Sequence, residues 1–202
     1  MLVVFDLDGT LVDSTQALLK AHDAAWASVG RARPSDKAIL ELIGLPLTHI
    51  METLGPEHDP AALSEVYSQA YVAASAEHER LFDGMAELLA KPFRAAVATG
   101  KSQRGADRVV RHFGLEDRFE VVLGGNSVPR PKPNPDMLHA IIERTGTKDV
   151  VMIGDTTFDL EMAHAAGVKA IGVSWGHHSA DRLRTWAPVV DTVDELERLL
   201  GV

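Results

Sequence analysis

Two short apolar runs, each followed at once by aspartates, constrain this chain more than any other feature. Residues 2–5 lead into Asp6 and Asp8, and residues 150–153 lead into Asp155. Short apolar runs bounded by polar turns are typical of buried strands in a parallel sheet. Because ligands of such sheets bind beyond the carboxyl ends of the strands, the aspartates predict a site at that edge.

Strands and helices alternate in the second part of the chain, which predicts an α/β fold. The predicted strands are the apolar runs at residues 95–98, 121–123, 150–153 and 170–173, and the stretches between them have helical character. Right-handed crossovers between such strands produce a doubly wound, Rossmann-like parallel sheet.

Residues 15–81 differ from the rest because they have helical patterns and no convincing strand. Helices are predicted at residues 15–29, 36–43, 46–54 and 60–76, from apolar spacing and from glycines or prolines near their ends. We therefore expect an α/β core made of residues 1–14 and 82–202. A small α-helical domain, residues 15–81, would be inserted after the first strand.

The composition excludes several classes of protein. The chain has 202 residues, no cysteine and a formal net charge of -9, so disulfides and thiol chemistry are ruled out. A negative charge argues against nucleic acid as a partner, and no apolar stretch has the ~18 residues of a membrane span. We expect a cytoplasmic protein, monomeric or homodimeric, that binds neither nucleic acid nor membranes.

Two further segments carry residues suited to an anion. Thr99 and Gly100 follow a predicted strand, where a hydroxyl and backbone N–H groups can donate hydrogen bonds, although Thr99 also suits a helix N-cap. Lys132 lies among prolines, either as a fixed cation or within an exposed proline-rich linker. A nucleotide-binding P-loop is excluded because Ala95 stands where that loop needs glycine.

Taken in order, the Asp-x-Asp segment at Asp6, the threonine Thr99, the lysine Lys132 and the spacing of Asp155 and Asp159 resemble the four motifs of the haloacid dehalogenase superfamily. The resemblance covers essentially the whole chain. Within the superfamily the chain is similar to phosphatases with a helical cap after the first strand, of the phosphoglycolate phosphatase type. The resemblance implies a Mg²⁺-dependent enzyme that hydrolyses a small phosphorylated metabolite, a phosphomonoester, through an aspartyl-phosphate.

The resemblance also implies a role for each motif residue. Asp6 would be the nucleophile that attacks phosphorus, and Asp8 the general acid and base. Thr99, Gly100 and Lys132 would bind the phosphate, and Lys132 would also neutralise the charge around the nucleophile.

A Mg²⁺ site is implied by the same motifs. The ligands would be Asp6, the backbone carbonyl of Asp8 and Asp155, with Asp159 supporting the metal through water or orienting the lysine. Mg²⁺ takes hard oxygen ligands and keeps several waters, which agrees with a site completed by substrate phosphate.

The helical domain would choose the substrate. The segment at residues 44–49 resembles the substrate-contacting loop of the family, and Arg31, Arg33 and His49 are candidates for specificity, although charged residues of such a domain are usually solvated. His177 and His178 follow a predicted strand on the catalytic side. A solvated loop is the simpler expectation for these two histidines, and a substrate role is the alternative.

Other functions stay open at this stage. A phosphosugar mutase of the β-phosphoglucomutase type would use the same Asp6 and Asp8 but return the phosphate to the sugar. Phosphonate cleavage would need an imine-forming lysine, for which Lys20 and Lys37 are available. A dehalogenase would not be expected to keep Asp8. A catalytically silent binding protein is the alternative outside enzymes.

Overall fold

A six-stranded parallel sheet forms the centre of the computed structural model, which describes residues 1–202. The strand order is β5-β4-β1-β6-β7-β8, and every neighbouring pair is parallel. The strands are β1 (Leu2–Phe5), β4 (Arg94–Ala98), β5 (Val121–Leu123), β6 (Val150–Gly154), β7 (Lys169–Val173) and β8 (Val189–Val190). Because the chain winds outward from β1 in both directions, the predicted doubly wound α/β fold is confirmed.

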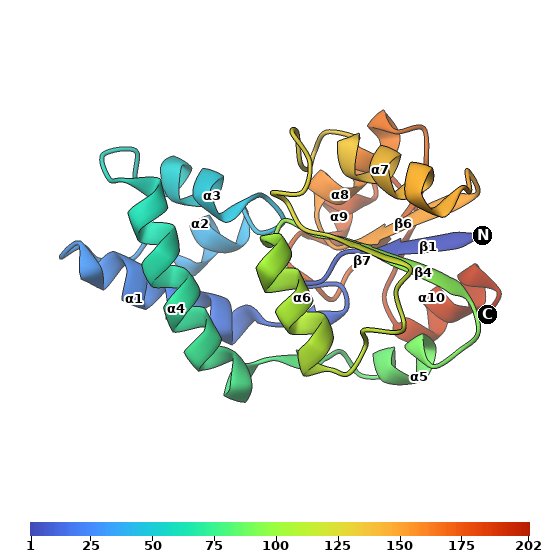
Figure 1. Cartoon of the computed structure of the whole chain (residues 1–202), viewed down its shortest axis with the longest axis horizontal. Coiled ribbons are helices and arrows are strands. Elements are labelled where there is room, and N and C mark those ends of the chain that lie inside the picture. Colours follow the sequence, from blue (N-terminus) through green and yellow to red (C-terminus); the bar gives the residue numbers. More distant parts are fainter.

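Helices cover both faces of this sheet. They are α5 (Met85–Leu89), α6 (Gln103–His112), α7 (Asp136–Thr145), α8 (Thr157–Ala165), α9 (Ala180–Leu183) and α10 (Val193–Leu200). Side chains alternate along a strand, so Val3 and Phe5 of β1 pack with α5, α6 and α10, whereas Leu2 and Val4 pack with α7 and α8. Figure 1 shows α7 and α8 above the sheet and α5 and α10 below it. A strand buried on both faces explains why residues 2–5 are continuously apolar.

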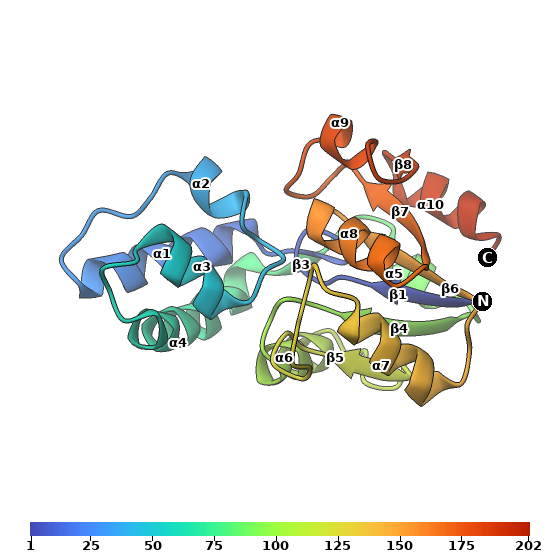
Figure 2. The same cartoon turned by 90° about the horizontal axis from the view of Figure 1, so that it is seen from above.

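The first four helices stand apart from the sheet as a bundle, called here the α1–α4 bundle (Figures 1 and 2). They are α1 (Thr15–Ser28), α2 (Asp36–Leu40), α3 (Leu47–Leu54) and α4 (Pro60–His78). The bundle has its own apolar core, which includes Trp26, Ile39, Met51, Leu63 and Tyr67. The second helix ends before the predicted residue 43, because the chain turns through Leu42 and Ile43 with i→i+3 hydrogen bonds.

A small antiparallel ribbon joins the bundle to the core. β2 (Val12–Asp13) leads into α1, and β3 (Arg80–Leu81) returns from α4 and pairs with β2. The Arg80 guanidinium lies 2.5 Å from the Asp13 carboxylate across this ribbon. The predicted junctions at residues 14/15 and 81/82 lie at this ribbon, and the division into two domains stays a prediction. Neither β2–β3 nor β8 was expected, because two-residue strands carry no periodic signal.

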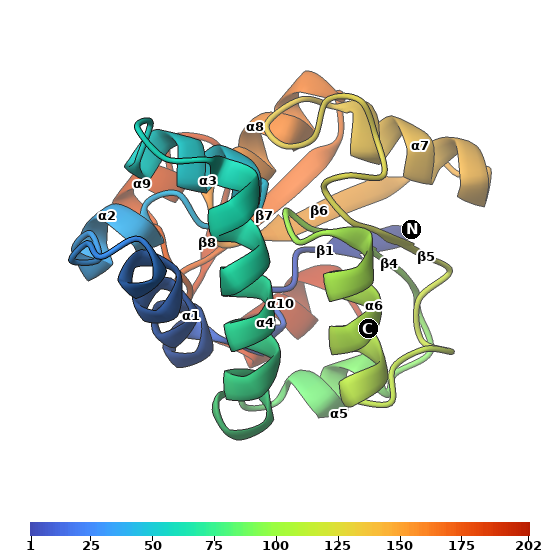
Figure 3. The same cartoon turned by 60° about the vertical axis from the view of Figure 1, so that its left-hand side comes forward.

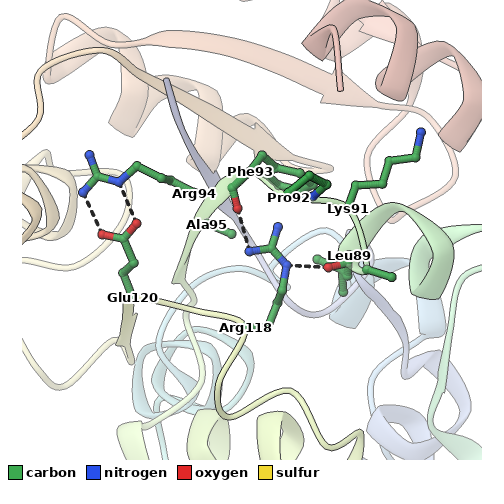
Figure 4. A pocket seen from close by; sticks show the side chains of 9 residues that line it. Leu89, Lys91, Pro92, Phe93, Arg94, Ala95, Arg118 and Glu120 are labelled. Carbon is green, nitrogen blue, oxygen red and sulfur yellow. Dashed lines mark hydrogen bonds and ion pairs between the residues drawn. The ribbon is translucent and has the colours of Figure 1, made fainter.

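The amino ends of the strands form the edge of the sheet opposite to the aspartates. A hollow of about 430 Å³ opens there, lined by Lys91, Phe93, Arg94 and Arg118 among others. The Arg118 guanidinium donates to the carbonyl oxygens of Leu89 (2.5 Å) and Phe93 (2.8 Å), so this arginine stabilises the turn between α5 and β4 (Figure 4). None of the helices has both the length and the apolar character that crossing a membrane requires.

The core of the α1–α4 bundle contains a histidine without a hydrogen-bond partner. His22 of α1 is fully buried, and neither ring nitrogen has a hydrogen-bond partner. Its ring lies edge-on to Tyr67 at 4.9 Å. Burial, helped by the positive charge of Arg33, lowers the pKa of His22 from 6.5 to about 4.

We predict that replacing His22 by phenylalanine removes part of the acid lability. Between pH 6.5 and 4 the unfolded chain binds a proton at His22 that the folded protein does not bind, so stability falls as the pH falls. The loss attributable to His22 approaches about 3 kcal/mol by pH 4. Urea unfolding at pH 7.5 and 4.5 measures it. The same pH dependence in His22→Phe and the unaltered protein would contradict the prediction.

Candidate active site

Three adjacent strands bring the predicted site residues to one edge of the sheet. Asp6 follows β1, Thr99 follows β4 and Asp155 follows β6, and β1 lies between the other two. All three residues are at most 1% exposed. Parallel pairing in register therefore places side chains far apart in sequence at neighbouring strand ends.

Asp6 carries the only buried side-chain oxygens in the protein that accept no hydrogen bond. The nearest cation is the Lys132 ammonium, 3.0 Å from Asp6 Oδ1. Burial raises the pKa of the Asp6 carboxyl to about 7, with Lys132 opposing the rise and the carboxylates of Asp159 and Asp155 adding to it. A buried carboxylate whose oxygens accept no hydrogen bond is costly even beside one ammonium group, so a cation that binds the Asp6 oxygens would offset part of that cost.

Lys132 is buried between two carboxylates and does not lie in an exposed linker. Its ammonium donates to Asp159 Oδ1 at 2.5 Å, and only 2% of the residue is exposed. Burial alone would lower the pKa of Lys132, but the negative charges of Asp159 and Asp6 raise it above its usual value. The lysine is therefore charged at neutral pH. Asp159 Oδ2 accepts from Thr156 N–H and its hydroxyl, in a capping box at the start of α8.

Asp155 is held by hydrogen bonds from two sides. Thr10 Oγ1 donates to Asp155 Oδ1 at 2.9 Å, and the backbone N–H of His177 donates to Oδ2 at 2.8 Å. The His177 ring Nδ1 also lies 2.9 Å from Oδ2. Although burial acts to raise it, the pKa of Asp155 is lowered by His177 and Thr10. These contacts keep the carboxylate ionised and oriented.

The carboxylates at this edge are suited to a divalent cation. Oxygen atoms of Asp6, Asp155 and Asp159 all lie within 4.8 Å of one another. The free oxygens of Asp6 supply acceptor sites, and carboxylate oxygens are the ligands that hard cations prefer. The donor set therefore fits a divalent metal. The assignment of Asp6, Asp155 and the Asp8 carbonyl as its ligands, with Asp159 in a supporting role, stays a prediction.

Asp8 lies next to this cluster, on the side of the α1–α4 bundle. Its Oδ1 accepts a hydrogen bond from the Ser14 hydroxyl, and its Oδ2 lies 3.0 Å from the Lys101 ammonium. Gly9 turns the chain after Asp8 with a φ of +81°, where a side chain would also collide with Asp155. The sequence reasoning missed Lys101, because a lysine at the end of a strand has no distinguishing local pattern.

The predicted phosphate-binding loop touches the α1–α4 bundle. Thr99 is buried, and its Oγ1 accepts from the backbone N–H of Lys101 at 3.3 Å. A methyl group added at Gly100 would collide with the backbone carbonyls of Gly44 and Leu45. The bundle segment around residue 44 therefore lies over the strand ends.

The three specificity candidates have partners within the bundle. Arg31 is paired with Glu57, Arg33 with Asp23 and Asp36, and His49 lies 4.0 Å from Glu52. None of these ion pairs reaches the aspartate cluster. A role of Arg31, Arg33 and His49 in specificity therefore stays a prediction without a supporting contact.

The expectation of a solvated loop is wrong for the two histidines. His177 contacts Asp155, and 3% of its side chain is exposed. His178 is 2% exposed, and its Nδ1 accepts from the Thr157 N–H at 3.0 Å. Since Nδ1 accepts, Nε2 carries the proton and donates to the Glu41 carbonyl in the bundle at 3.2 Å. Their position after β7, next to β6, was the only sequence signal for this placement.

Comparison with known proteins identifies relatives of this chain. Residues 3–173 match the family model described as haloacid dehalogenase-like hydrolase. The chain is 35% identical to the probable phosphatase IndB of Dickeya dadantii, over 96% of this chain and 91% of that protein. It is 30% identical to a phosphoglycolate phosphatase of Photobacterium profundum, with coverages of 99% and 94%.

A relative with a different name is equally similar. The tyrosine-protein kinase PtkA of Mycobacterium tuberculosis is 34% identical over 100% of this chain and 72% of that protein. The solved structure of PtkA matches this chain with a TM-score of 0.84 and 32% identity, covering 100% of this chain and 98% of that one.

We predict that Lys132→Met destabilises the metal-free protein by about 3–5 kcal/mol, because it leaves buried carboxylates without their cation. The double variant Lys132→Met/Asp159→Asn should recover part of this loss, since it removes one of the uncompensated charges. Urea unfolding at pH 8 measures both, and the exposed Lys148→Met serves as the matched control. A change no larger than that of the control would show that Lys132 does not balance these charges.

Proposed function

The chain belongs to the haloacid dehalogenase-like hydrolase family, and on that premise we propose that it is a Mg²⁺-dependent phosphatase of small phosphomonoesters. The nucleophile is Asp6, and the reaction passes through an aspartyl-phosphate. One observation carries the proposal: Asp6 has the only buried side-chain oxygens without a hydrogen bond, beside a charged lysine and two further carboxylates.

In the first step Asp6 attacks phosphorus. A carboxylate oxygen forms the new P–O bond, the bond from phosphorus to the ester oxygen breaks, and Asp8 gives its proton to that oxygen. Lys132 lies 3.0 Å from Asp6, so its charge offsets the negative charge that gathers around phosphorus. The Thr99 hydroxyl and the N–H groups near Gly100 are donors for the phosphoryl oxygens.

In the second step water attacks the phosphorus of the aspartyl-phosphate. Asp8, now a carboxylate, takes the proton of the water, phosphate leaves and Asp6 is regenerated. Asp6, Asp155 and the Asp8 carbonyl, supported by Asp159, would hold Mg²⁺, which when bound supplies positive charge for the phosphoryl oxygens. The α1–α4 bundle acts as a cap that limits access of water and selects the alcohol.

Two other fates of the phosphoryl group are compatible with the same nucleophile. The similarity to a protein named tyrosine-protein kinase favours transfer to a tyrosine hydroxyl as a second candidate function. A phosphosugar mutase would return the group to a sugar. The three functions differ in the group that finally accepts the phosphoryl group, so the identity of the product separates them.

We predict that the protein releases phosphate from a panel of small phosphomonoesters, phosphoglycolate and sugar phosphates among them, only when Mg²⁺ is present. Asp6→Asn should lower the rate on the order of 10³-fold or more, because an amide does not form the covalent intermediate. A malachite-green assay measures the release. The exposed Asp83→Asn is the matched control and should retain activity.

The acceptor is identified in parallel reactions with the same protein. Label from γ-labelled ATP that enters a tyrosine peptide, without release of free phosphate, would replace hydrolysis by kinase chemistry. A sugar 1-phosphate converted to the 6-phosphate would establish a mutase. If a folded protein that binds Mg²⁺ transfers phosphate to none of these acceptors, the protein is a binding protein without catalytic activity.

We predict that Mg²⁺ stabilises the folded protein through this cluster. At 100 times the dissociation constant, the gain in unfolding free energy should be about 2.7 kcal/mol. Asp155→Asn should lose most of that gain, because it removes one charged ligand, whereas Asp83→Asn should keep it. Thermal unfolding across a Mg²⁺ titration measures the effect. Equal gains in the two variants would place the metal elsewhere.

A further inference from the structure

Lys101 occupies a position that the proposed chemistry does not use. It follows Thr99 and Gly100 in the connection from β4 to α6. Its ammonium lies 3.0 Å from Asp8 Oδ2 and 3.9 Å above the centre of the Tyr71 ring of α4. The side chain is 12% exposed. Lys101, a residue of the core, therefore lies between Asp8, which serves as both acid and base in the proposed reaction, and helix α4 of the bundle.

The contacts of Asp8 leave its carboxylate little freedom. The Ser14 hydroxyl donates to Oδ1, and the Lys101 ammonium faces Oδ2 from the opposite side. A lysine side chain has many rotamers, so a second contact restricts its position further. The face of an aromatic ring attracts an ammonium group, and Tyr71 supplies this second contact.

Tyr71 is itself held by residues of both the bundle and the core. Its ring stacks on Tyr67, with centroids 5.8 Å apart, and its hydroxyl donates to Glu79. The Glu79 carboxylate is fully buried and accepts two hydrogen bonds from Arg108 of α6, at 2.8 and 2.9 Å. Figure 3 shows α4 alongside α6. Arg108 thus connects α6 to Glu79, just beyond the end of α4, and through Glu79 to the Tyr71 hydroxyl.

We propose that Lys101 is a positioning residue for Asp8 and that the ring of Tyr71 holds Lys101 in place. The position of α4 thereby sets the orientation of the acid and base of the reaction. The inference rests on the proposed function, since Asp8 needs an orientation only if it transfers a proton to and from the reacting oxygens. It adds a residue from the bundle to the control of the chemical step.

The test compares two substrates that differ in their need for an acid. An alkyl ester such as phenethyl phosphate expels a poorly acidic alcohol, which needs a proton, whereas 4-nitrophenyl phosphate expels an acidic phenol, which does not. Lys101→Met should lower kcat/KM for the alkyl ester about 10- to 100-fold and for the aryl ester less than about 3-fold. Asp8→Asn should show the same selective loss, and the exposed Lys148→Met is the matched control.

Variants of Tyr71 test the second contact. Tyr71→Leu removes the ring and should reproduce the selective loss of Lys101→Met. Tyr71→Phe keeps the ring and loses only the hydroxyl that donates to Glu79. Its ratio of kcat/KM for the alkyl ester to kcat/KM for the aryl ester should therefore stay close to that of the unaltered protein. Thermal unfolding with and without Mg²⁺ shows whether each variant is folded.

The outcomes separate the two proposals. If Lys101→Met lowers kcat/KM equally for both esters, or does not lower it, the positioning role of Lys101 is wrong. The proposed phosphatase activity is not affected by that result. A loss in Tyr71→Phe as large as in Tyr71→Leu would overturn the role of the ring. Absence of Mg²⁺-dependent hydrolysis in the unaltered protein, with no effect of Asp6→Asn, would instead remove the proposed function.

Discussion

The buried ammonium of Lys132 is the interaction on which the site depends. Parallel strands with aspartates at their ends concentrate negative charge at one edge, and Asp6 and Asp159 are both within 3.0 Å of Lys132. Without this cation, the desolvated carboxylates would repel one another and take up protons. The Lys132 ammonium lies between Asp6, after β1, and Asp159, in the first turn of α8, and so links the end of the strand to the start of the helix.

The carboxylates around Lys132 are not all satisfied by hydrogen bonds. Asp155 and Asp159 each accept hydrogen bonds from neighbouring side chains and backbone, whereas Asp6 accepts none. Burial and the neighbouring carboxylates raise the pKa of Asp6 to about 7. Such an arrangement costs stability in the protein without a bound cation, and it agrees with the proposed roles of the Asp6 oxygens as metal ligand and nucleophile.

The sequence predicts the core of the fold and the strand-end residues for one physical reason. Continuous apolar runs identify buried parallel strands, and such strands place the residues after them at a common edge, which brings Asp6, Thr99 and Asp155 together. The contacts of Lys101 with Asp8 and of His177 with Asp155 were not predicted, because they depend on how loops return over that edge. The spacing of residues along one loop carries no information about the partner on another.

The α1–α4 bundle and the core are linked by contacts that local charge patterns do not reveal. Backbone at Gly44 meets Gly100, His178 donates to the Glu41 carbonyl, and Arg108 pairs with Glu79. All three use backbone groups or buried charges, whereas the conspicuous arginines of the bundle pair with their own neighbours. Exposed charges contribute little to fixed geometry because water competes for them. The position of the bundle on the core is therefore set by buried groups such as Glu79 and by the backbone around Gly44, rather than by these arginines.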